Sequence, residues 1–231
     1  MPIVFLTGFM GAGKTTGGRR LAEQLNAKAT GTVWQFVDLD DFIVRKTEQS
    51  IPSLFEIRGE EGFRFIERQC LHCLVESVGE NEGLVVATGG GTPCWDDNMA
   101  YMKAHGRTVY LRLPASQLAQ RLSAEDLSRR PVLQRELMQM AGTGTLVKMP
   151  GQETEVSQRC QAQATKSLLE TAVERLLAER EPWYLQAHTV LSPAELLSGK
   201  WLETIQCPDS CFQSCEVGIL STSKLELPLA R

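Results

Sequence analysis

The sequence lacks any long apolar run, and this absence argues against a membrane-spanning helix. The chain has 231 residues, of which 42% are hydrophobic and 23% charged, and no apolar run approaches the roughly 20 residues needed to cross a bilayer. The N-terminus also lacks the basic stretch and cleavage site typical of a signal peptide. We therefore expect a cytoplasmic protein with no membrane partner and with one main domain plus additions.

An excess of positive charge is also missing. The net charge is -4 and the pI is about 5.5. Proteins that bind nucleic acid usually present a strongly basic face that neutralises phosphates. We therefore expect no nucleic-acid partner and favour small-molecule chemistry. Separately, we expect a monomer.

The cysteines show no pattern of a disulfide framework, because an odd number, seven, is spread along the chain. Cysteines cluster in two segments, and neither segment is accompanied by the further ligands that a zinc site needs. Reduced thiols are favoured in both, with metal binding as the alternative. The segments are ERQCLHCLVE, with Cys70, His72 and Cys73, and CPDSCFQSC, with Cys207, Cys211 and Cys215.

Short apolar runs alternate with helical patterns as far as about residue 192, which predicts an α/β fold with a parallel sheet covered by helices on both faces. The expected strands are Ile3 to Thr7, Trp34 to Asp38, Leu84 to Ala87, Thr108 to Leu113 and His188 to Leu191. The expected helices are Lys14 to Leu25, Asp41 to Thr47, Gly62 to Val78, Asp96 to His105, Ser116 to Leu122 and Lys166 to Glu179.

Two segments depart from this alternation. From Gln134 to about Thr165 the sequence becomes polar and rich in Gly, Gln and Thr, which favours a mobile surface insertion over core. Beyond Trp201 no period is evident. We therefore predict a P-loop domain over residues 1–201, with a lid and polar insertion at about 123–165, and a C-terminal extension over 202–231.

The stretch GFMGAGKTT, from Gly8 to Thr16, matches G-x-x-x-x-G-K-[ST] between an expected strand and an expected helix. Glycines let successive N–H groups point inward, and the new helix adds its positive N-terminal end. A dinucleotide site is excluded because the glycine spacing is not G-x-G-x-x-G. We expect ATP or GTP to bind here. The expected contacts are Gly11, Ala12, Gly13, Lys14, Thr15 and Thr16.

Within this loop, Lys14 is expected to reach the β- and γ-phosphates, and the Thr15 hydroxyl to ligate Mg²⁺. No N-K-x-D signature is present, which disfavours a GTPase switch. No strand ends in four apolar residues followed by Asp-Glu, which disfavours an ATPase motor. A small-molecule kinase remains.

The second expected strand ends in QFVDLDDFI, with Asp38 and Asp40 two residues apart. Alternate strand positions share a face, and open α/β sheets bind ligands at the carboxyl ends of their strands. Both carboxylates are therefore expected to point into one cleft. Asp41 has the opposite parity and is predicted to cap the following helix.

Further motifs suit an acidic acceptor. A triple-glycine turn exposes backbone amides, and arginines can clamp a carboxylate or a transferring phosphate. The residues are Arg64 and Glu67 in EEGFRFIERQ, Gly89 to Gly91 in VVATGGGTP, Arg129 and Arg130 in LSRRPVL, and Arg180 in AEREPWY.

Taken in order, D-x-D, F-R-x-x-E, G-G-G, R-P and R-x-P-x-Y resemble the motifs of the shikimate kinase family, from Ile3 to about Trp201. This resemblance implies a five-stranded parallel sheet of the nucleoside monophosphate kinase type with a mobile lid. It also implies transfer of the γ-phosphate of ATP to the 3-hydroxyl of shikimate, a step toward chorismate and the aromatic amino acids.

The resemblance implies roles for single residues on the donor side. Lys14 and Arg130 would act in catalysis on the ATP phosphates, with Arg130 supplied by the lid. Asp38 would hold Mg²⁺ through water beside Thr15. Arg121 would lie near the adenine.

On the acceptor side, the resemblance makes Asp40 the catalytic base or orienter for the 3-hydroxyl. Arg64 and Arg180 would clamp the shikimate carboxylate, and Gly90 would donate its amide. The region after Pro131 is longer than the compact lid usual in the family, and the tail beyond Trp201 has no counterpart.

Two alternatives remain. A related small-molecule kinase, such as one acting on gluconate, would share the P-loop and lid, but an acceptor without a carboxylate would leave Arg64 and Arg180 without purpose. A catalytically silent nucleotide-binding regulator is disfavoured because every residue needed for transfer is present.

Overall fold

A five-stranded parallel sheet forms the centre of the computed structural model, which describes residues 2–29, 31–123, 130–142, 155–199 and 201. The strand order is β2-β3-β1-β4-β5, and every neighbouring pair is parallel. The predicted α/β class is confirmed. The strands are β1 Ile3–Thr7, β2 Val33–Asp38, β3 Glu82–Ala87, β4 Arg107–Leu111 and β5 Thr189–Leu191.

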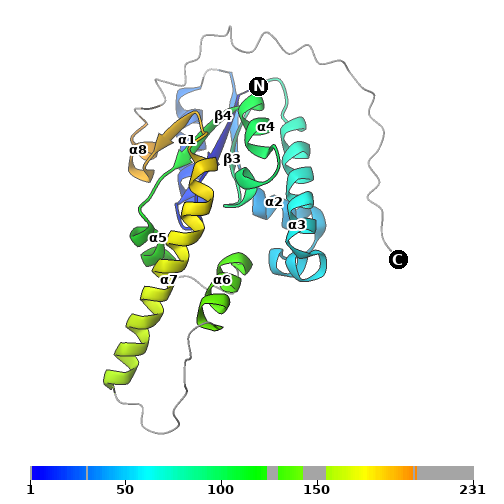
Figure 1. Ribbon diagram of the computed structural model, residues 1–231. Helices are drawn as coiled ribbons and strands as arrows, with labels where there is room; N and C mark the ends of the chain where they lie inside the picture. The colour runs from blue at the N-terminus through cyan, green and yellow to red at the C-terminus, as the bar shows by residue number, and fades with distance from the viewer. Residues whose placement is uncertain (1, 30, 124–129, 143–154, 200, 202–231) are drawn as a thin grey trace.

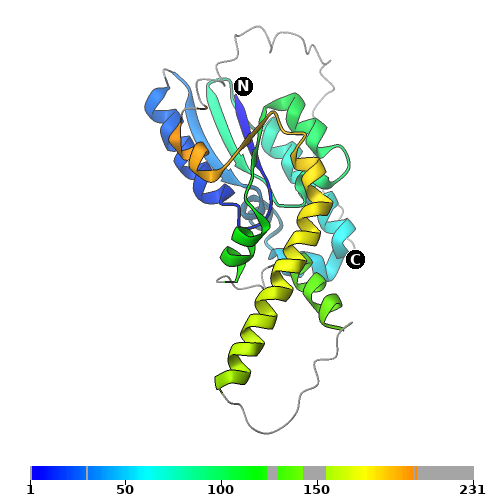
Figure 2. The same cartoon turned by 60° about the vertical axis from the view of Figure 1, so that its left-hand side comes forward.

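Helices cover both faces of the sheet. Figures 1 and 2 show α1 and α8 on one face and α3 and α4 on the other, while α7 extends past the sheet with α6 beside it. The elements are α1 Lys14–Lys28, α2 Leu39–Thr47, α3 Ile51–Glu76, the 3₁₀ helix η1 Thr92–Cys94, α4 Asn98–His105, α5 Ala115–Leu122, α6 Pro131–Gly142, α7 Glu155–Tyr184 and α8 Pro193–Ser198.

The sheet separates two apolar cores because successive side chains of a strand point to opposite faces. On β1, Val4 and Leu6 pack with residues of α1, α5, α7 and α8. Ile3 and Phe5 pack with residues of α2, α3 and α4. All four side chains are buried, as expected for a central strand of a parallel sheet.

The register brings three strand ends to the same level. Leu6 of β1 pairs with Ala87 of β3, and Asp38 of β2 pairs with the same Ala87. The segments that follow β1, β2 and β3 therefore begin side by side at the carboxyl edge of the sheet, where open α/β sheets bind ligands.

Helix α3 is longer than predicted. It begins at Ile51 rather than Gly62, with the Ser50 side chain accepting a hydrogen bond from the Ser53 N–H and with Pro52 in the first turn. Proline is tolerated there because the first N–H groups have no intrahelical partner. A kink follows at Gly59, whose φ of 68° and ψ of -178° are not helical.

The segment predicted as a polar surface insertion contains helical structure. Helix α6 spans Pro131–Gly142 and α7 begins at Glu155, so only residues 143–154 within it lie outside the described chain. Leu133 is fully buried, and Leu137 and Met140 pack against the core that also contains residues of α7. The interpretation of residues 134–142 as purely surface was therefore wrong.

The cysteine segments have different outcomes. Cys70 and Cys73 are free thiols on α3, the first buried and the second exposed. Cys207, Cys211 and Cys215, with the whole predicted extension over 202–231, lie outside the described residues. In the described part of the chain, no group of three or more His, Cys, Asp or Glu side chains is arranged so that it could hold a metal ion, and no helix is long and apolar enough to cross a membrane.

A buried threonine holds β4 against β5. Thr108 is fully buried, its backbone N–H donates to His188 Nδ1 at 3.1 Å, and the His188 N–H donates to Thr108 Oγ1 at 3.0 Å. Burial, together with Arg107 and Lys103, lowers the pKa of His188, so that its ring stays a neutral acceptor.

Thr108→Val keeps the shape of this side chain but removes the acceptor of the His188 N–H. We expect a loss of about 1–3 kcal/mol in the free energy of unfolding, measured by urea denaturation. Thr171→Val is the control, since that hydroxyl is exposed on α7 and donates to the Ser167 carbonyl at 3.0 Å. Equal unfolding midpoints for the two variants would contradict the role of Thr108.

Candidate functional site

The loop between β1 and α1 is shaped by three glycines. Gly8, Gly11 and Gly13 have φ values of 133°, 76° and 90°, which side chains other than glycine rarely adopt. Helix α1 begins immediately afterwards, at Lys14, so its first N–H groups face the loop. The predicted phosphate loop therefore has the backbone that such a loop requires.

Lys14 is buried inside this loop. Its Nζ donates to the carbonyl oxygens of Gly8 at 2.8 Å and Phe9 at 2.9 Å. Burial lowers the pKa of Lys14 to about 8, and the nearby carboxylate of Asp40 opposes this decrease. The loop thus holds a cationic group at its centre, which suits an anion.

Thr15 and Asp38 join the donor loop to the end of β2. Thr15 Oγ1 donates to Asp38 Oδ2 at 2.6 Å, and Asp38 Oδ1 accepts from the Asp40 N–H at 3.1 Å. Asp38 therefore caps α2, and the prediction that Asp41 does so was wrong. The helix starts directly after β2, at Leu39, which leaves the exposed Asp41 in its first turn.

Asp40 lies between the donor loop and the turn after β3. A Cβ placed on Gly89 would lie 3.3 Å from Asp40 Oδ1, so the carboxylate faces this turn. Burial and the negative charges of Glu67 and Asp38 raise the pKa of Asp40 to about 6, although Lys14 acts in the opposite direction.

Arg64 and Glu67 form a buried ion pair on α3. Arg64 Nη1 donates to Glu67 Oε2 at 2.6 Å, while the second carboxylate oxygen, Oε1, accepts from Thr92 Oγ1 at 2.5 Å. Burial lowers the pKa of Arg64, but the charge and hydrogen bond of Glu67 outweigh it and raise this pKa overall. Gly91 lies against this guanidinium, because a Cβ there would be 2.1 Å from Arg64 Nη2.

The end of α7 closes over the triple-glycine turn. The Tyr184 hydroxyl donates to the Gly90 carbonyl, and a Cβ on Gly90 would lie 3.6 Å from Arg180 Nη1. The Arg180 guanidinium also lies 5.8 Å from the centre of the Phe9 ring. Arg180 is therefore beside both the donor loop and the triple-glycine turn.

A cavity of about 480 Å³ lies between α3, η1, α6 and α7, and its lining includes Arg64, Gly91, Arg135 and Arg180. Three arginines and three glutamates line it, and the planar guanidinium groups of Arg64 and Arg180 offer paired donors that suit a carboxylate. Glu60 of α3 also lines it and accepts from Arg135 Nη2 at 2.7 Å. An ion pair thus joins α3 to α6 at this cavity.

Two further arginines approach the donor loop. The charge of Arg130 contributes to the lowered pKa of Lys14 and acts against the raised pKa of Asp40, so Arg130 is near enough to influence both groups. Arg121 Nη1 donates to the Gly11 carbonyl at 3.1 Å. Arg129 lies outside the described residues.

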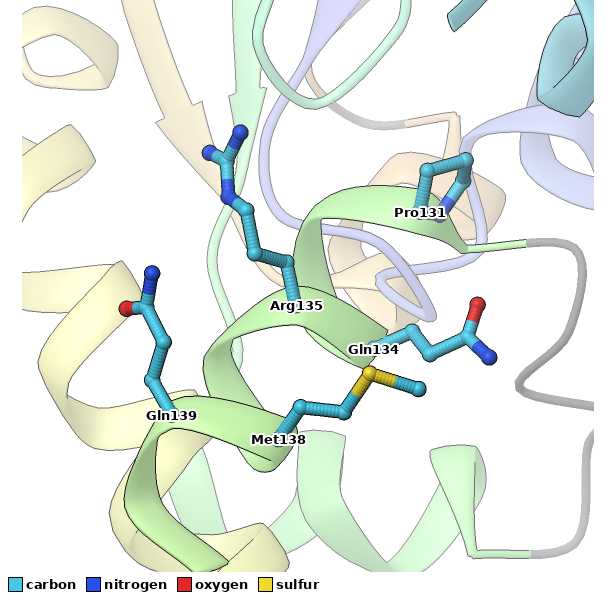
Figure 3. A pocket seen from close by; sticks show the side chains of 5 residues that line it. All are labelled: Pro131, Gln134, Arg135, Met138 and Gln139. Carbon is cyan, nitrogen blue, oxygen red and sulfur yellow. The ribbon is translucent and has the colours of Figure 1, made fainter. Parts of the chain in front are cut away.

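A second hollow, of about 440 Å³, is lined by α6 residues only. Figure 3 shows Arg135 and Gln139 pointing to one side of α6 and Gln134 and Met138 to the other. Arg135 and Gln139 also line the arginine-rich cavity, so α6 forms one of its walls.

The structure gathers the predicted site residues at the carboxyl edge of the sheet. The residues predicted for the donor side are Gly11, Ala12, Gly13, Lys14, Thr15, Thr16, Asp38 and Arg130, and those predicted for the acceptor side are Asp40, Arg64, Gly90 and Arg180. Sequence reasoning missed Thr92, Glu60 and Arg135. Thr92 carried no signal beyond its place after the glycines, and Arg135 lies on a helix that was not predicted.

Comparison with known proteins agrees with this arrangement. The model of the family described as shikimate kinase matches residues 10–206. The chain belongs to the shikimate kinase family. The predicted family membership is confirmed.

Relatives named shikimate kinase include proteins from Parabacteroides distasonis and Salinibacter ruber. The first is 47% identical over 122 residues, covering 53% of this chain and 64% of that protein. The second is 36% identical over 205 residues, covering 87% of this chain and 83% of that protein. The alignment with the first relative thus spans less than two thirds of its length, whereas the second runs along most of both chains.

Solved shikimate kinases share the fold. The enzyme from Acinetobacter baumannii, in complex with shikimate, is 33% identical with a TM-score of 0.64, covering 89% of this chain and 93% of that one. The enzyme from Bacteroides thetaiotaomicron is 34% identical with a TM-score of 0.59, covering 84% of this chain and 88% of that one. The predicted five-stranded kinase sheet is confirmed by these likenesses and by the strand order.

Proposed function

We propose that this protein is a shikimate kinase, which transfers the γ-phosphate of ATP to the 3-hydroxyl of shikimate and releases shikimate 3-phosphate and ADP. The observation that carries this proposal is the position of an arginine-lined cavity beside a phosphate loop at one sheet edge. Family membership and the shikimate bound to the A. baumannii relative support it.

On the donor side, the amides from Gly11 to Thr16 receive the phosphates, and Lys14 supplies charge to the β- and γ-phosphates. Thr15 and Asp38, whose side-chain oxygens lie 2.6 Å apart, fit Mg²⁺, because this ion prefers oxygen ligands and keeps several waters. Bound Mg²⁺ would neutralise phosphate charge during transfer. Arg130 adds a second cation to this region.

On the acceptor side, the shikimate carboxylate pairs with Arg64 and Arg180, whose planar guanidinium groups suit bidentate recognition. Gly90 offers its N–H to the substrate, and the Tyr184 hydroxyl, which donates to the Gly90 carbonyl, helps to hold this turn in place. Asp40 orients the 3-hydroxyl and accepts its proton. With a pKa of about 6, this carboxyl is mostly ionised at neutral pH and can act as a base.

Transfer relies on positioning and charge. In a loose transition state the equatorial oxygens of the moving phosphoryl group carry spread negative charge, and Lys14 and Arg130 stabilise it. Exclusion of water prevents wasteful hydrolysis of ATP. We assign this exclusion to the lid region at about 123–165, in which α6 forms a wall of the acceptor cavity.

We also infer one catalytic domain over residues 1–201 and a separate extension over 202–231. The burial of Trp201, whose Nε1 donates to the Leu196 carbonyl at 2.9 Å, supports this boundary. An assay on a chain truncated after Trp201 tests whether the extension affects catalysis. The expectation that the protein is a cytoplasmic monomer stays a prediction.

The proposed activity predicts which acceptor the protein uses. In an assay that couples ADP release to a spectrophotometric signal, we expect turnover of shikimate that requires ATP and Mg²⁺. Gluconate, other hydroxy acids and neutral sugars serve as competing acceptors at equal concentration. Turnover of gluconate equal to or better than that of shikimate would overturn the proposal, and ATP binding without turnover of any acceptor would favour a regulator.

Asp40→Asn tests the acceptor role of this carboxylate. Because an amide cannot accept the hydroxyl proton, we expect kcat to fall by about 10²-fold or more. The Kd for ATP, measured by calorimetry, should remain nearly unchanged. A strong loss of nucleotide affinity would instead assign Asp40 to the donor side.

Gly91→Ala tests the position of Arg64. The added methyl group would overlap the guanidinium, so we expect the KM for shikimate to rise on the order of tenfold or more while the KM for ATP is retained. Gly79→Ala is the matched control. Gly79 lies before β3, and a Cβ there would meet only the flexible side chain of Glu82, at 3.3 Å. Equal KM values for shikimate in the two variants would contradict the assignment.

A further inference from the structure

Thr92 directly follows the triple glycine and has no role predicted from the sequence, yet its side chain completes the buried ion pair of α3. It is fully buried, and its hydroxyl donates to Glu67 Oε1 at 2.5 Å. The other oxygen, Oε2, accepts from Arg64 Nη1 at 2.6 Å. Each oxygen of the Glu67 carboxylate is therefore taken by a different strong donor.

The Thr92 hydroxyl is held in place independently of α3. The Thr92 N–H donates to the Gly89 carbonyl at 3.2 Å, and the Thr92 carbonyl accepts from Asn98 Nδ2 at 3.0 Å. Asn98 is fully buried at the start of α4. The hydroxyl thus has a position fixed by the triple-glycine turn and α4, and it transmits that position to Glu67.

The hydrogen bond from Thr92 to Glu67 Oε1 influences how the Arg64 guanidinium pairs with this carboxylate. A guanidinium and a carboxylate favour a bidentate arrangement with two parallel hydrogen bonds. The Thr92 hydroxyl competes with the guanidinium for Oε1, and Arg64 pairs with Glu67 through Oε2. Its Nη2 lies against Gly91 at the wall of the acceptor cavity, 3.8 Å from Glu60 Oε1. In this geometry the Nη2 group of Arg64 is directed to the cavity.

We propose that Thr92 is a positioning residue for the acceptor. Its hydroxyl competes for Glu67 Oε1, disfavours bidentate pairing within α3, and thereby directs the Arg64 guanidinium to the carboxylate of the acceptor. This inference rests on the proposed function, since it assigns to Arg64 the task of binding that carboxylate.

Thr92→Val tests the inference, because it retains the shape of the side chain and removes the hydroxyl. We expect the KM for shikimate to rise on the order of tenfold, since the guanidinium turns toward the released oxygen, while kcat and the KM for ATP change by less than about twofold. Thr92→Ser restores the hydroxyl and should restore the KM for shikimate.

Thr108→Val is the matched control. It also removes a buried threonine hydroxyl, but at the start of β4 and away from the carboxyl edge of the sheet, so it should reduce stability without changing the KM for shikimate. A wild-type KM for shikimate in Thr92→Val, or a Ser variant that behaves like the Val variant, would overturn the inference.

Crystal structures of the wild type and Thr92→Val separate this inference from the proposed function. We expect Arg64 to bind both oxygens of Glu67 in the variant and to move away from Gly91. An unmoved guanidinium would overturn the positioning role even if the wild type phosphorylates shikimate. If the wild type does not turn over shikimate, the proposed function fails, while the two structures still decide how Thr92 controls Arg64.

Discussion

The buried pair of Arg64 and Glu67 is the interaction on which the acceptor half of the site depends. Removing charged groups from water costs several kcal/mol per ion unless hydrogen bonds and an opposite charge compensate. Glu67 receives both from Arg64 and Thr92, which fastens α3 to η1. The same carboxylate contributes to the raised pKa of Asp40, so one buried group acts on both the residue proposed to bind the acid and the proposed base.

The donor half depends on backbone geometry more than on side-chain pairs. Its glycines have positive φ values, and the Lys14 ammonium is held by carbonyl oxygens of its own loop. The two halves meet at Asp38, which accepts from the Thr15 hydroxyl and caps the helix that carries Asp40. A single aspartate therefore fixes the donor loop relative to the start of the acceptor side.

Local patterns predicted the fold class and the site residues whose position follows from a strand end. Strand β1 and the phosphate loop were predicted with their correct bounds, because an apolar run, a glycine motif and a helix start succeed one another within a few residues. Asp38 and Asp40 were placed correctly at the carboxyl edge for the same reason. The capping role of Asp41 was wrong because parity along a strand does not reveal where the next helix begins.

Features that depend on tertiary contacts were not predicted. The first part of α3 contains Pro52 and Gly59, two residue types that usually indicate the end of a helix when read from sequence. In the structure, Pro52 lies in the first turn of the helix and Gly59 at its kink. Helix α6 carries only four polar residues among its twelve, within a segment whose remainder is polar and Gly-rich, and it packs through Leu133 and Leu137 against the core shared with α7. The contact of Thr92 with Glu67 joins residues 25 positions apart, and no short spacing in the sequence indicates it.

The strand order β2-β3-β1 fixes the spacing between the segments that follow these three strands. Neighbouring strands lie about 4.8 Å apart, so the loop after β1, the glycine turn after β3 and the aspartates after β2 emerge at successive, fixed intervals. Backbone hydrogen bonds set these intervals, whatever apolar side chains fill the two cores. The distance between the proposed donor and acceptor positions can therefore persist while the core sequence diverges, whereas a slip of one residue between β1 and β3 would remove the alignment.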